Sequence, residues 1–567
     1  MRTLLLISIL FCHNALWSQT TEVTTALLNT PEFTQPLKIT PILAGNFGEL
    51  RSNHFHAGLD IKTLHKEGFK VHAIADGYVS RIKISHWGYG KAIYIRHKNG
   101  LSSVYAHLQK FSPEIEAYIN NEQYKRASYT LEVFPKENLL PVFRDSLIAY
   151  SGNTGGSTAP HLHFEMRKAG TAIAVNPIKY NNNIKDLTPP EIQKIYVYPK
   201  TPKAHANQSE KKIQLGIKKV SPGMYTTDKV RLKGGVAFGI KAYDRQDLAA
   251  NKNGVFSYKL FKNDSLLTHI NFNDFSFYET SYINTLIDYQ QLIDSKERIL
   301  MLDSEQAADL SVVKSKKNAG VINLNHGEEA TLEVVLEDFH GNDTRIKIPV
   351  IGVSDTAVIK KKIQKTPFPI YFKSPAHFKL THASIYFPAK SFYKDAYLDL
   401  KENEKRITVH HKGVPLHKNF TLSFKPGDTA WSKNSYIAYQ INKKQSIYSP
   451  TKRAQGWLTT NTKKLGTYEI KEDSIPPSIE ARNFKPNQNI KNYQYLSLTI
   501  KDIETGIKTY EAYLNDRWIL MEYEPKRNTI THHIGDKTNL KTVNKLEVRV
   551  TDMLNNSTTY STSLQWK

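Results

Sequence analysis

The sequence predicts a mainly β protein, in which an antiparallel-sheet domain is followed by two or three Ig-like β-sandwich domains. Its 567 residues are too many for one hydrophobic core, because single cores stop growing near ~250 to 300 residues. Short β-type runs separated by Gly-containing turns fill about residues 31–180, and a long succession of short strands follows residue 185. A repeat within that second part indicates that two of the sandwich domains share one fold.

The first 18 residues are expected to be a cleaved signal peptide. Arg2 precedes an apolar run from Leu4 to Cys12, and the small residue Ser18 precedes a polar stretch. Phe11 stands where a lipoprotein would have a small residue, so we expect the sole cysteine to be lost with the signal. The mature chain would then contain no disulfide and, lacking a later run of ~20 apolar residues, no membrane span. We therefore expect an exported protein of the periplasm, the extracellular space or the outer envelope.

The composition is strongly basic, with a formal net charge of +24. Removing Arg2, the only charged residue of the signal, leaves +23. Such a surface favours an anionic partner, and in an exported protein a cell-wall polymer or an anionic envelope polymer is a better candidate than nucleic acid. The alternative is that Lys-rich stretches such as "KSKKN" and "IKKKIQK" are ordinary solvated faces.

One helix is predicted in the first domain, residues 19–185. Ser112 is a candidate N-cap and Pro113 a first helical residue, and they precede apolar residues at helical spacing, Ile115, Tyr118 and Ile119. The helix would open an insertion of about residues 112–142.

The rest of the chain contains the repeat. "DLTPPEIQKI" at Asp186 is echoed by "DSIPPSIEAR" at Asp473. Asp338 precedes Asn342 by four residues, as Asp552 precedes Asn556. The Pro-Pro steps favour extended linkers, which fits domain boundaries. The predicted domains are a β-sandwich at 186–352 with an insertion at about 265–330, a β domain of uncertain type at 353–472, and the second sandwich copy at 473–567.

Two histidine-rich segments, "HFHAGLD" and "HLHFEMR", are candidates for metal binding. With 21 His in the chain a His-x-His pair is expected roughly once by chance, so spacing alone proves nothing. His161 and His163 follow a Gly/Ser/Thr turn on a β-type run, where residues i and i+2 share a face about 6.6 Å apart. In a regular strand His56 and Asp60 would lie about 13 Å apart, so the chain must turn, and Gly58 allows it. Two imidazoles and one carboxylate favour zinc, with a fourth position left for water.

The ordered segments "HFHAGLDIKT", "VHAIADGYVSRI", "GYGKAIYIRHKNGLSSVYAHL", "IAYSGNTGGSTAPHLHFEMR" and "VNPI" closely resemble the M23 zinc metallopeptidases of the LytM and lysostaphin type. The resemblance covers about residues 45–180. It implies one zinc ion per chain, with His56, Asp60 and His163 as ligands. It also places His161 and His107 at the catalytic positions that assist the water and stabilise the oxyanion. His54 is the competing ligand candidate, but only His56 gives the His-x-x-x-Asp spacing with Asp60.

The resemblance implies an exported endopeptidase that cuts peptide cross-links in peptidoglycan. The direct D-alanyl cross-link is favoured over a glycine bridge. Two alternatives stay open: an inactive relative that binds the wall or activates an amidase, and a secreted peptidase directed at other bacteria or extracellular protein. The 112–142 insertion departs from the family pattern and is either a wall or lid of the groove or a packed side insertion. We expect non-catalytic β domains that position the peptidase, so that residues 19–185 alone keep activity on a soluble peptide.

Overall fold

The computed structural model describes residues 33–567, apart from 181–182, 248, 305–309, 363–364, 428–429 and 536–539. The predicted signal peptide lies outside the described residues. The predicted fold class is confirmed: nearly all regular structure is β, and the sheets are antiparallel except where β28 pairs with β19 and β20. Among the described helices, none is long and apolar enough to cross a membrane.

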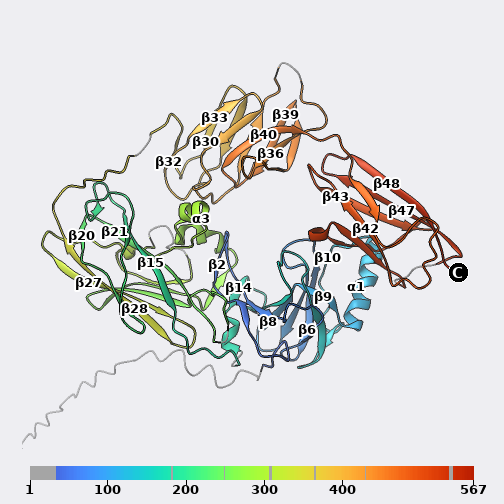
Figure 1. Ribbon diagram of the computed structural model, residues 1–567, viewed down its shortest axis with the longest axis horizontal. Coiled ribbons are helices and arrows are strands. Elements are labelled where there is room, and N and C mark those ends of the chain that lie inside the picture. Colours follow the sequence, from blue (N-terminus) through green and yellow to red (C-terminus); the bar gives the residue numbers. More distant parts are fainter. Residues whose placement is uncertain are drawn as a thin grey trace, which may run out of the picture.

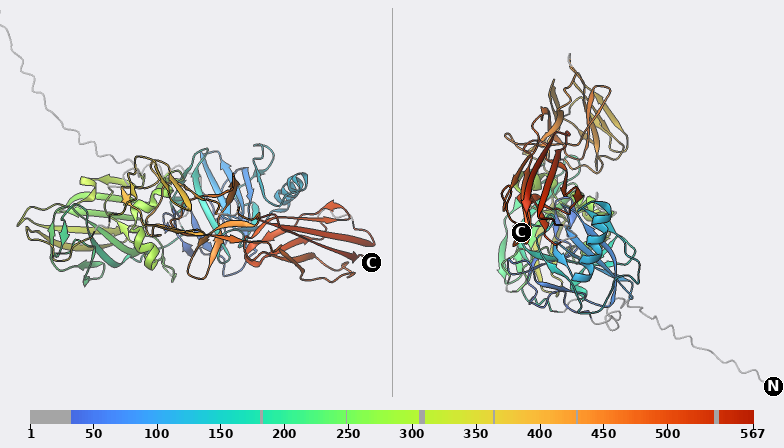
Figure 2. Two further views of the ribbon diagram at one scale, coloured as in Figure 1. Left: turned by 90° about the horizontal axis from the view of Figure 1, so that it is seen from above. Right: turned by 90° about the vertical axis from the view of Figure 1, so that its right-hand side faces the viewer.

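The four parts of the chain follow one another around a ring (Figure 1). The N-terminal domain (residues 33–180) leads into the first sandwich (186–352), then the middle domain (369–472) and the C-terminal sandwich (473–567), which returns to the N-terminal domain beside α1. Seen from above, the parts lie roughly in one layer (Figure 2).

The N-terminal domain is built on one antiparallel sheet with the order β1-β4-β13-β8-β7-β6-β10. Its strands are β1 (Leu43–Gly45), β4 (Leu59–Lys62), β13 (His161–Lys168), β8 (Leu101–Ala106), β7 (Lys91–His97), β6 (Gly77–Ile84) and β10 (Leu131–Val133), with β11 (Pro141–Val142) on β6 and β14 (Ile173–Val175) on β13. A second sheet contains β5 (Lys70–His72), β12 (Leu147–Ser151) and β9 (Leu108–Phe111), and a hairpin contains β2 (Leu50–Arg51) and β3 (His54–Phe55). The 3₁₀ turn η2 (Pro177–Tyr180) ends the domain. Most apolar residues of these runs are buried in one core, and a small second cluster lies on the other face of β7 and β8.

The predicted helix is confirmed as α1 (Pro113–Arg126), with Pro113 at its start. It buries Ile115 and Ile119, and the chain beyond it adds β10 and β11 to the edge of β6. The ring of Tyr124 lies 5.3 Å from that of Trp518 in the C-terminal sandwich. These contacts support the alternative of a packed side insertion, which forms an interface with the last domain.

The first sandwich consists of two sheets. One contains β17 (Ile213–Leu215), β15 (Glu191–Pro199), β21 (Val236–Tyr243) and β25 (Leu300–Met301). The other contains β16 (His205–Ala206), β20 (Val230–Lys233), β28 (Asp343–Gly352), β27 (Glu329–Glu337), β22 (Ser257–Lys262), β23 (Ser265–Asn271) and β26 (Val313–Lys316), with β18 (Lys218–Ser221) and β19 (Met224–Thr226) at one edge. Short elements connect them, namely β24 (Asp274–Ser276), η3 (Thr280–Tyr282), α2 (Ile283–Leu286), α3 (Tyr289–Ser295) and η4 (Asn318–Gly320).

The N-terminal domain and the first sandwich share one hydrophobic core. Strand β24, from the predicted insertion at 265–330, pairs with β14 and so extends the N-terminal sheet. Phe275 on β24 stacks on Phe47 with ring centroids 4.8 Å apart and also contacts Phe55. The predicted insertion thus connects the first sandwich to the N-terminal domain.

This shared core changes the expectation for residues 19–185. Without β24, Phe47 and Phe55 would be exposed, and burying one such side chain is worth about 1.5–3 kcal/mol. We now expect residues 33–352 to unfold cooperatively, and residues 19–185 to melt at a clearly lower temperature or to aggregate. Circular dichroism of both fragments during heating measures this. Equal thermal unfolding midpoints of the two fragments would contradict the prediction. They would show that residues 19–185 fold independently.

The middle domain and the C-terminal sandwich have separate cores. The middle domain pairs β30 (Ala376–Lys379), β31 (Ala383–Phe387), β35 (Phe420–Phe424), β39 (Trp457–Thr462) and β38 (Thr451–Ala454) in one sheet, β33 (Leu400–Asn403), β34 (Arg406–Val409), β40 (Gly466–Glu472), β36 (Ser435–Gln440) and β37 (Ser446–Tyr448) in the other, and β29 (Pro369–Ile370) with β32 (Ala396–Tyr397). The C-terminal sandwich pairs β41 (Ser478–Ala481), β42 (Tyr495–Lys501), β46 (Thr529–His533) and β45 (Glu522–Glu524) in one sheet, and β44 (Arg517–Trp518), β43 (Ile507–Leu514), β47 (Val543–Asp552) and β48 (Ser557–Gln565) in the other, with η5 (Pro525–Arg527) between β45 and β46.

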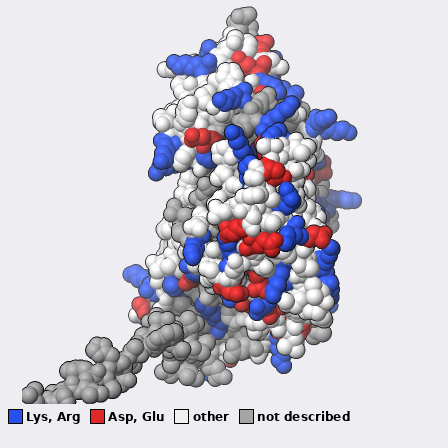
Figure 3. All heavy atoms as spheres, turned by 90° about the vertical axis from the view of Figure 1, so that its left-hand side faces the viewer, with Lys and Arg blue, Asp and Glu red and all other residues white. Residues whose placement is uncertain are grey.

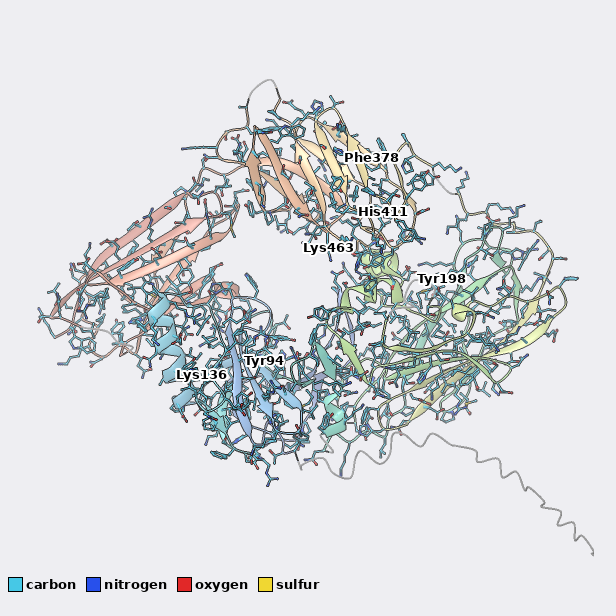
Figure 4. All side chains as sticks on the ribbon, turned by 180° about the vertical axis from the view of Figure 1, so that it is seen from behind. Tyr94, Lys136, Tyr198, Phe378, His411 and Lys463 are labelled. Atoms are coloured by element: carbon cyan, nitrogen blue, oxygen red, sulfur yellow. The ribbon has the colours of Figure 1, made fainter. Side chains whose placement is uncertain are left out.

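Junctions between the domains close the ring. Tyr198 of the first sandwich lies near the junction with the middle domain (Figure 4). There the rings of Tyr282 and His417 lie 4.5 Å apart, and the Tyr393 hydroxyl donates to the Ser281 carbonyl at 3.0 Å.

The sequence repeat corresponds to a repeated hydrogen-bond network. Asn342 Nδ2 donates to the Asp186 carbonyl at 3.0 Å and to Asp338 Oδ2 at 2.6 Å. In the second copy, Asn556 Nδ2 donates to the Asp473 carbonyl at 3.1 Å and to Asp552 Oδ2 at 2.7 Å. The shared Asp-x-x-x-Asn spacing therefore ties the linker before each sandwich to its penultimate strand.

Candidate metal centre

The predicted site residues meet where β4, β8 and β13 lie side by side. On β13, His163 is opposite Asp60 of β4 on one side and Ala106 of β8 on the other. His161 shares its face, because alternate residues of a strand point the same way. His107 directly follows Ala106 and has a φ of 59°, a left-handed conformation uncommon in residues other than glycine. Its ring centroid lies 4.9 Å from that of His161.

His56 reaches Asp60 because the chain bends at Gly58, between β3 and β4. A Cβ at this position would lie 2.4 Å from the backbone oxygen of Phe164, so a larger residue would collide with β13. The sequence predicted a turn here through backbone freedom. The structure shows the turn and gives close backbone approach as the reason for glycine.

His56, Asp60 and His163 form a compact, buried triad. Asp60 Oδ1 lies 3.1 Å from His56 Nε2 and 2.8 Å from His163 Nδ1, and the two ring nitrogens are 3.1 Å apart. Burial alone would raise the pKa of Asp60, but His56 and hydrogen bonds from the neighbouring imidazoles hold it well below its usual range. Asp60 Oδ2 accepts a hydrogen bond from Arg51 Nη2 at 2.6 Å.

Each triad imidazole has its outer nitrogen bound to a hydrogen-bond acceptor. His56 Nδ1 donates to the Asn46 carbonyl at 2.7 Å, and His163 Nε2 donates to Glu165 Oε1 at 2.8 Å. In a neutral ring, the other nitrogen then carries a lone pair, so His56 Nε2 and His163 Nδ1 present lone pairs to the same point. Such an arrangement fits a cation bound by two imidazoles and a carboxylate, which is the donor set that suits zinc.

Glu165 is a supporting residue that the sequence reasoning missed. It is fully buried, bonded to His163, and paired with Arg167 at 2.6 Å. Burial would raise the pKa of its carboxyl, but Arg167 and His163 lower it to about 2. Tyr89 also donates to Glu165 and stacks on His163 at 5.1 Å. The available signal was the strand alternation itself, since Glu165 is two residues beyond His163.

Glu165→Gln should weaken zinc binding about 10- to 100-fold, the usual effect of removing an outer partner of a metal-bound histidine. The amide oxygen can still accept from His163, but the partly buried Arg167 loses its counter-charge. Competition with a zinc chelator measures the affinity. The exposed Glu67 provides the matched control, Glu67→Gln, and equal affinities of the two variants would contradict this role.

The two other predicted histidines lie beside the triad. His161 Nδ1 donates to the Ala159 carbonyl at 2.8 Å, and its Nε2 is 3.4 Å from Asp60 Oδ1. His107 Nδ1 donates to the Thr154 carbonyl at 2.9 Å. Burial, together with His163 and His161, lowers the pKa of His107 to about 3. Both rings therefore keep an Nε2 lone pair that can accept a proton.

His54, the competing ligand candidate, is not part of this cluster. It is exposed on β3, and its Nδ1 bonds to the Ser52 carbonyl at 2.9 Å. The structure therefore separates the two members of "HFH", with His56 at the triad and His54 at the surface.

The C-terminal sandwich borders the site, which the sequence did not indicate. Lys526 Nζ donates to the carbonyls of Asn153 and, at 3.1 Å, Ser157, in the loop before His161. Lys91 Nζ, which is buried, donates to both carboxylate oxygens of Glu522 at 3.1 and 3.0 Å. The loop that leads to the candidate catalytic histidine is thus held by two domains.

Comparisons with known proteins identify two segments. Residues 54–124 match the Peptidase family M23 model, and residues 369–473 match the Zu5-like domain model. A DD-carboxypeptidase/endopeptidase Mpg of Neisseria meningitidis is 32% identical over 139 residues, covering 24% of this chain and 26% of that protein. An uncharacterized metalloprotease of Haemophilus influenzae is 29% identical over 142 residues, covering 25% of each. The chain spans about a quarter of the length of these curated relatives.

Similar solved structures include two peptidases. The catalytic domain of lysostaphin from Staphylococcus simulans is 25% identical, covers 24% of this chain and 87% of its own, and has a TM-score of 0.18. A zinc-containing peptidase from Vibrio cholerae is 25% identical, covers 24% of this chain and 36% of its own, and also has a TM-score of 0.18.

Proposed function

We propose that this chain, whose N-terminal domain is a peptidase family M23 domain, is an exported zinc metalloendopeptidase that hydrolyses peptide cross-links of peptidoglycan. The observation that carries the proposal is the buried triad of His56, Asp60 and His163, in which both imidazoles have their outer nitrogens bound to acceptors and their inner nitrogens 3.1 Å apart. An inactive relative has no need to keep these ligands together with their partners.

In the proposed site, His56 Nε2, Asp60 and His163 Nδ1 would hold one zinc ion. When bound, zinc supplies Lewis acidity, which polarises the scissile carbonyl and acidifies a water molecule. The chain keeps these ligands in their binding form through the Asn46 carbonyl and Glu165.

His161 and His107 are the proposed catalytic residues. Each donates its Nδ1 hydrogen to a backbone carbonyl, which fixes the ring and leaves Nε2 as a proton acceptor. Either ring can therefore take a proton from the attacking water, and the ring so protonated can then donate to the oxyanion or to the leaving amine. Burial keeps His107 neutral, so that its Nε2 lone pair can accept a hydrogen bond from the attacking water and orient it.

The chemistry of the site favours an amide bond over a glycosidic bond. Glycoside hydrolysis needs a pair of carboxyl groups, one of them protonated to serve as the acid. The two carboxylates here, Asp60 and Glu165, both have a lowered pKa and are held by cationic or imidazole partners. Neither can serve as that acid near neutral pH.

The direct D-alanyl cross-link is the proposed target. The relative from Neisseria meningitidis is named a DD-carboxypeptidase/endopeptidase, and the direct cross-link joins D-residues, whereas a glycine bridge does not. The two hydrogen bonds from Lys526 to the loop before His161 support a positioning role for the C-terminal sandwich.

The basic surface is proposed to assist attachment to anionic envelope polymers. On one face, the alternative of an ordinary solvated surface is favoured. On the side shown in Figure 3, Lys and Arg side chains lie interspersed with Asp and Glu. Ion pairs also form on the first sandwich, such as Lys200 with Asp303 at 2.8 Å. That face is a solvated surface without a continuous basic patch.

Digestion of directly cross-linked sacculi tests the function. The zinc-loaded chain should convert dimeric muropeptides to monomers and leave every glycan bond intact, as mass analysis would show. A His163→Ala preparation controls for contaminating hydrolases. Release of shortened glycans, or activity on glycine-bridged walls only, would contradict the proposal.

A further inference from the structure

A small cavity lies where the N-terminal domain meets the first sandwich. It has a volume of about 20 Å³ and shares no residue with the zinc triad. Asp186 and Asp244 of the first sandwich line it together with Asn253, and Asn46 and Asn176 line it from the N-terminal domain. This volume is enough for one water-sized particle.

Two carboxylates, those of Asp186 and Asp244, line this cavity, and a third, that of Asp338, lies beside them. Asp186 and Asp338 offer oxygen atoms within 4.8 Å of each other, and Asp244 is close enough to feel the charge of both. All three side chains are buried. The backbone amides of His340 and Asn342 donate to Asp338, each at 2.8 Å. The three carboxyl groups nevertheless lie close together in one buried region.

Two oxygen atoms at the cavity have no partner. Asp244 Oδ1 and Asn253 Oδ1 are buried and lack a hydrogen-bond partner among the described residues. The two side chains are only 6% and 5% exposed, so bulk water does not solvate them. A buried carboxylate or amide oxygen without a hydrogen-bond partner destabilises the folded state unless a ligand binds it.

We propose that a calcium ion binds in this cavity, at the junction of the N-terminal domain and the first sandwich. Its ligands are the carboxylates of Asp186 and Asp244 and the amide oxygen of Asn253, which all line the cavity, and Asp338 adds negative charge beside them. The site is distinct from the zinc centre and from the proposed peptidase activity.

The donor set selects calcium. All buried donors are oxygen atoms, which hard cations prefer over the imidazole and thiolate donors typical of zinc. Magnesium usually retains several of its water ligands, and a cavity of about 20 Å³ has no room for them. His340, which also lies near Asp186 and Asp338, is exposed and is not needed.

The site is linked to the zinc centre through Asn46. Its Nδ2 donates to the Gly254 carbonyl at 2.7 Å, and the Gly254 amide donates to its Oδ1 at 2.9 Å. Gly254 follows the proposed ligand Asn253 directly. The Asn46 carbonyl in turn holds His56. Calcium binding would therefore order the turn at Asn253 and Gly254. This turn holds Asn46, which in turn bonds to the zinc ligand His56.

The second repeat copy provides an internal comparison. Asp473, Asp502 and Asp552 form an equivalent cluster. There, Thr505 Oγ1 donates to Asp473 Oδ2 at 2.8 Å, and the amides of Thr505 and Gly506 donate to Asp502 Oδ2 at 2.8 and 2.6 Å. The protein itself thus supplies the donors that are missing in the first copy, and we propose no ion in the second.

Calcium titration of the full, zinc-loaded chain tests the site. Calcium is first removed with a chelating resin, and one equivalent of zinc is restored. Calorimetric titration with calcium chloride should then show one calcium ion bound per chain. The thermal midpoint should rise by about 3–8 °C at saturating calcium, and magnesium chloride at the same concentration should have less than half this effect. No binding by the wild-type chain, or a response to added zinc chloride alone, would overturn the proposal.

Variants assign the effect to the cavity. Asp244→Asn keeps the shape but removes one charge, so it should raise the midpoint without calcium and abolish the calcium response. Asn253→Asp should do the opposite, with a lower midpoint without calcium and a larger rise with it. Asp502→Asn is the matched control in the second copy and should respond like the wild type. A normal calcium response of Asp244→Asn, or loss of the response in Asp502→Asn alone, would refute the assignment.

Discussion

His163→Ala should abolish both zinc binding and peptidase activity. The substitution removes a triad nitrogen that lies 2.8 Å from Asp60 Oδ1, and it leaves Glu165 without its imidazole partner. Because metal binding adds to the free energy of folding, the thermal midpoint in the presence of zinc should fall as well. Metal analysis of the purified chain, together with an assay on sacculi, measures the first two effects.

His54→Ala is the matched control for this experiment. His54 is only two residues from His56, but it is exposed and bonded to Ser52, so this variant should retain one zinc ion and full activity. Asp60→Ala should behave like His163→Ala. Zinc-free wild-type protein prepared without chelator, or loss of zinc from His54→Ala with retention in His163→Ala, would show that the ligands are assigned wrongly.

The core of this site could be predicted because its signals are local in the sequence. His56 and Asp60 lie four residues apart with Gly58 between them, and His161 and His163 alternate on a strand. A spacing of this kind specifies a shared face or a turn wherever the strand lies in the fold. The order of the matching segments added His107, which no local spacing indicates.

Partners from distant segments could not be predicted in this way. Asn46 acts through its backbone carbonyl, and any residue type has one, so no side chain marks the position. Lys526 reaches the loop before His161 across 369 residues of sequence and resembles many other lysines of this basic chain. Strand β24 reads as part of an insertion until its pairing with β14 is known. Long-range pairing depends on the complete tertiary structure, which single-sequence patterns do not contain.

His107→Ala should retain zinc but lose about 10²- to 10⁴-fold in rate, the usual contribution of acid–base assistance. His107 donates to Thr154 and contacts His161 and His163 through its ring. It is not one of the three residues of the buried triad. Its loss should therefore affect the reaction and leave the bound metal in place.

The backbone at this position calls for a second variant. Because His107 has a φ of 59°, alanine there adds local strain, whereas asparagine tolerates the left-handed region better. His107→Asn should thus match His107→Ala in activity and exceed it in stability. The exposed His65 has a similar φ of 59°, so His65→Ala controls for strain alone and should remain active. If His107→Ala loses zinc while His56→Ala keeps it, the roles of the two histidines are reversed, and if His107→Asn is fully active, His107 takes no part in proton transfer.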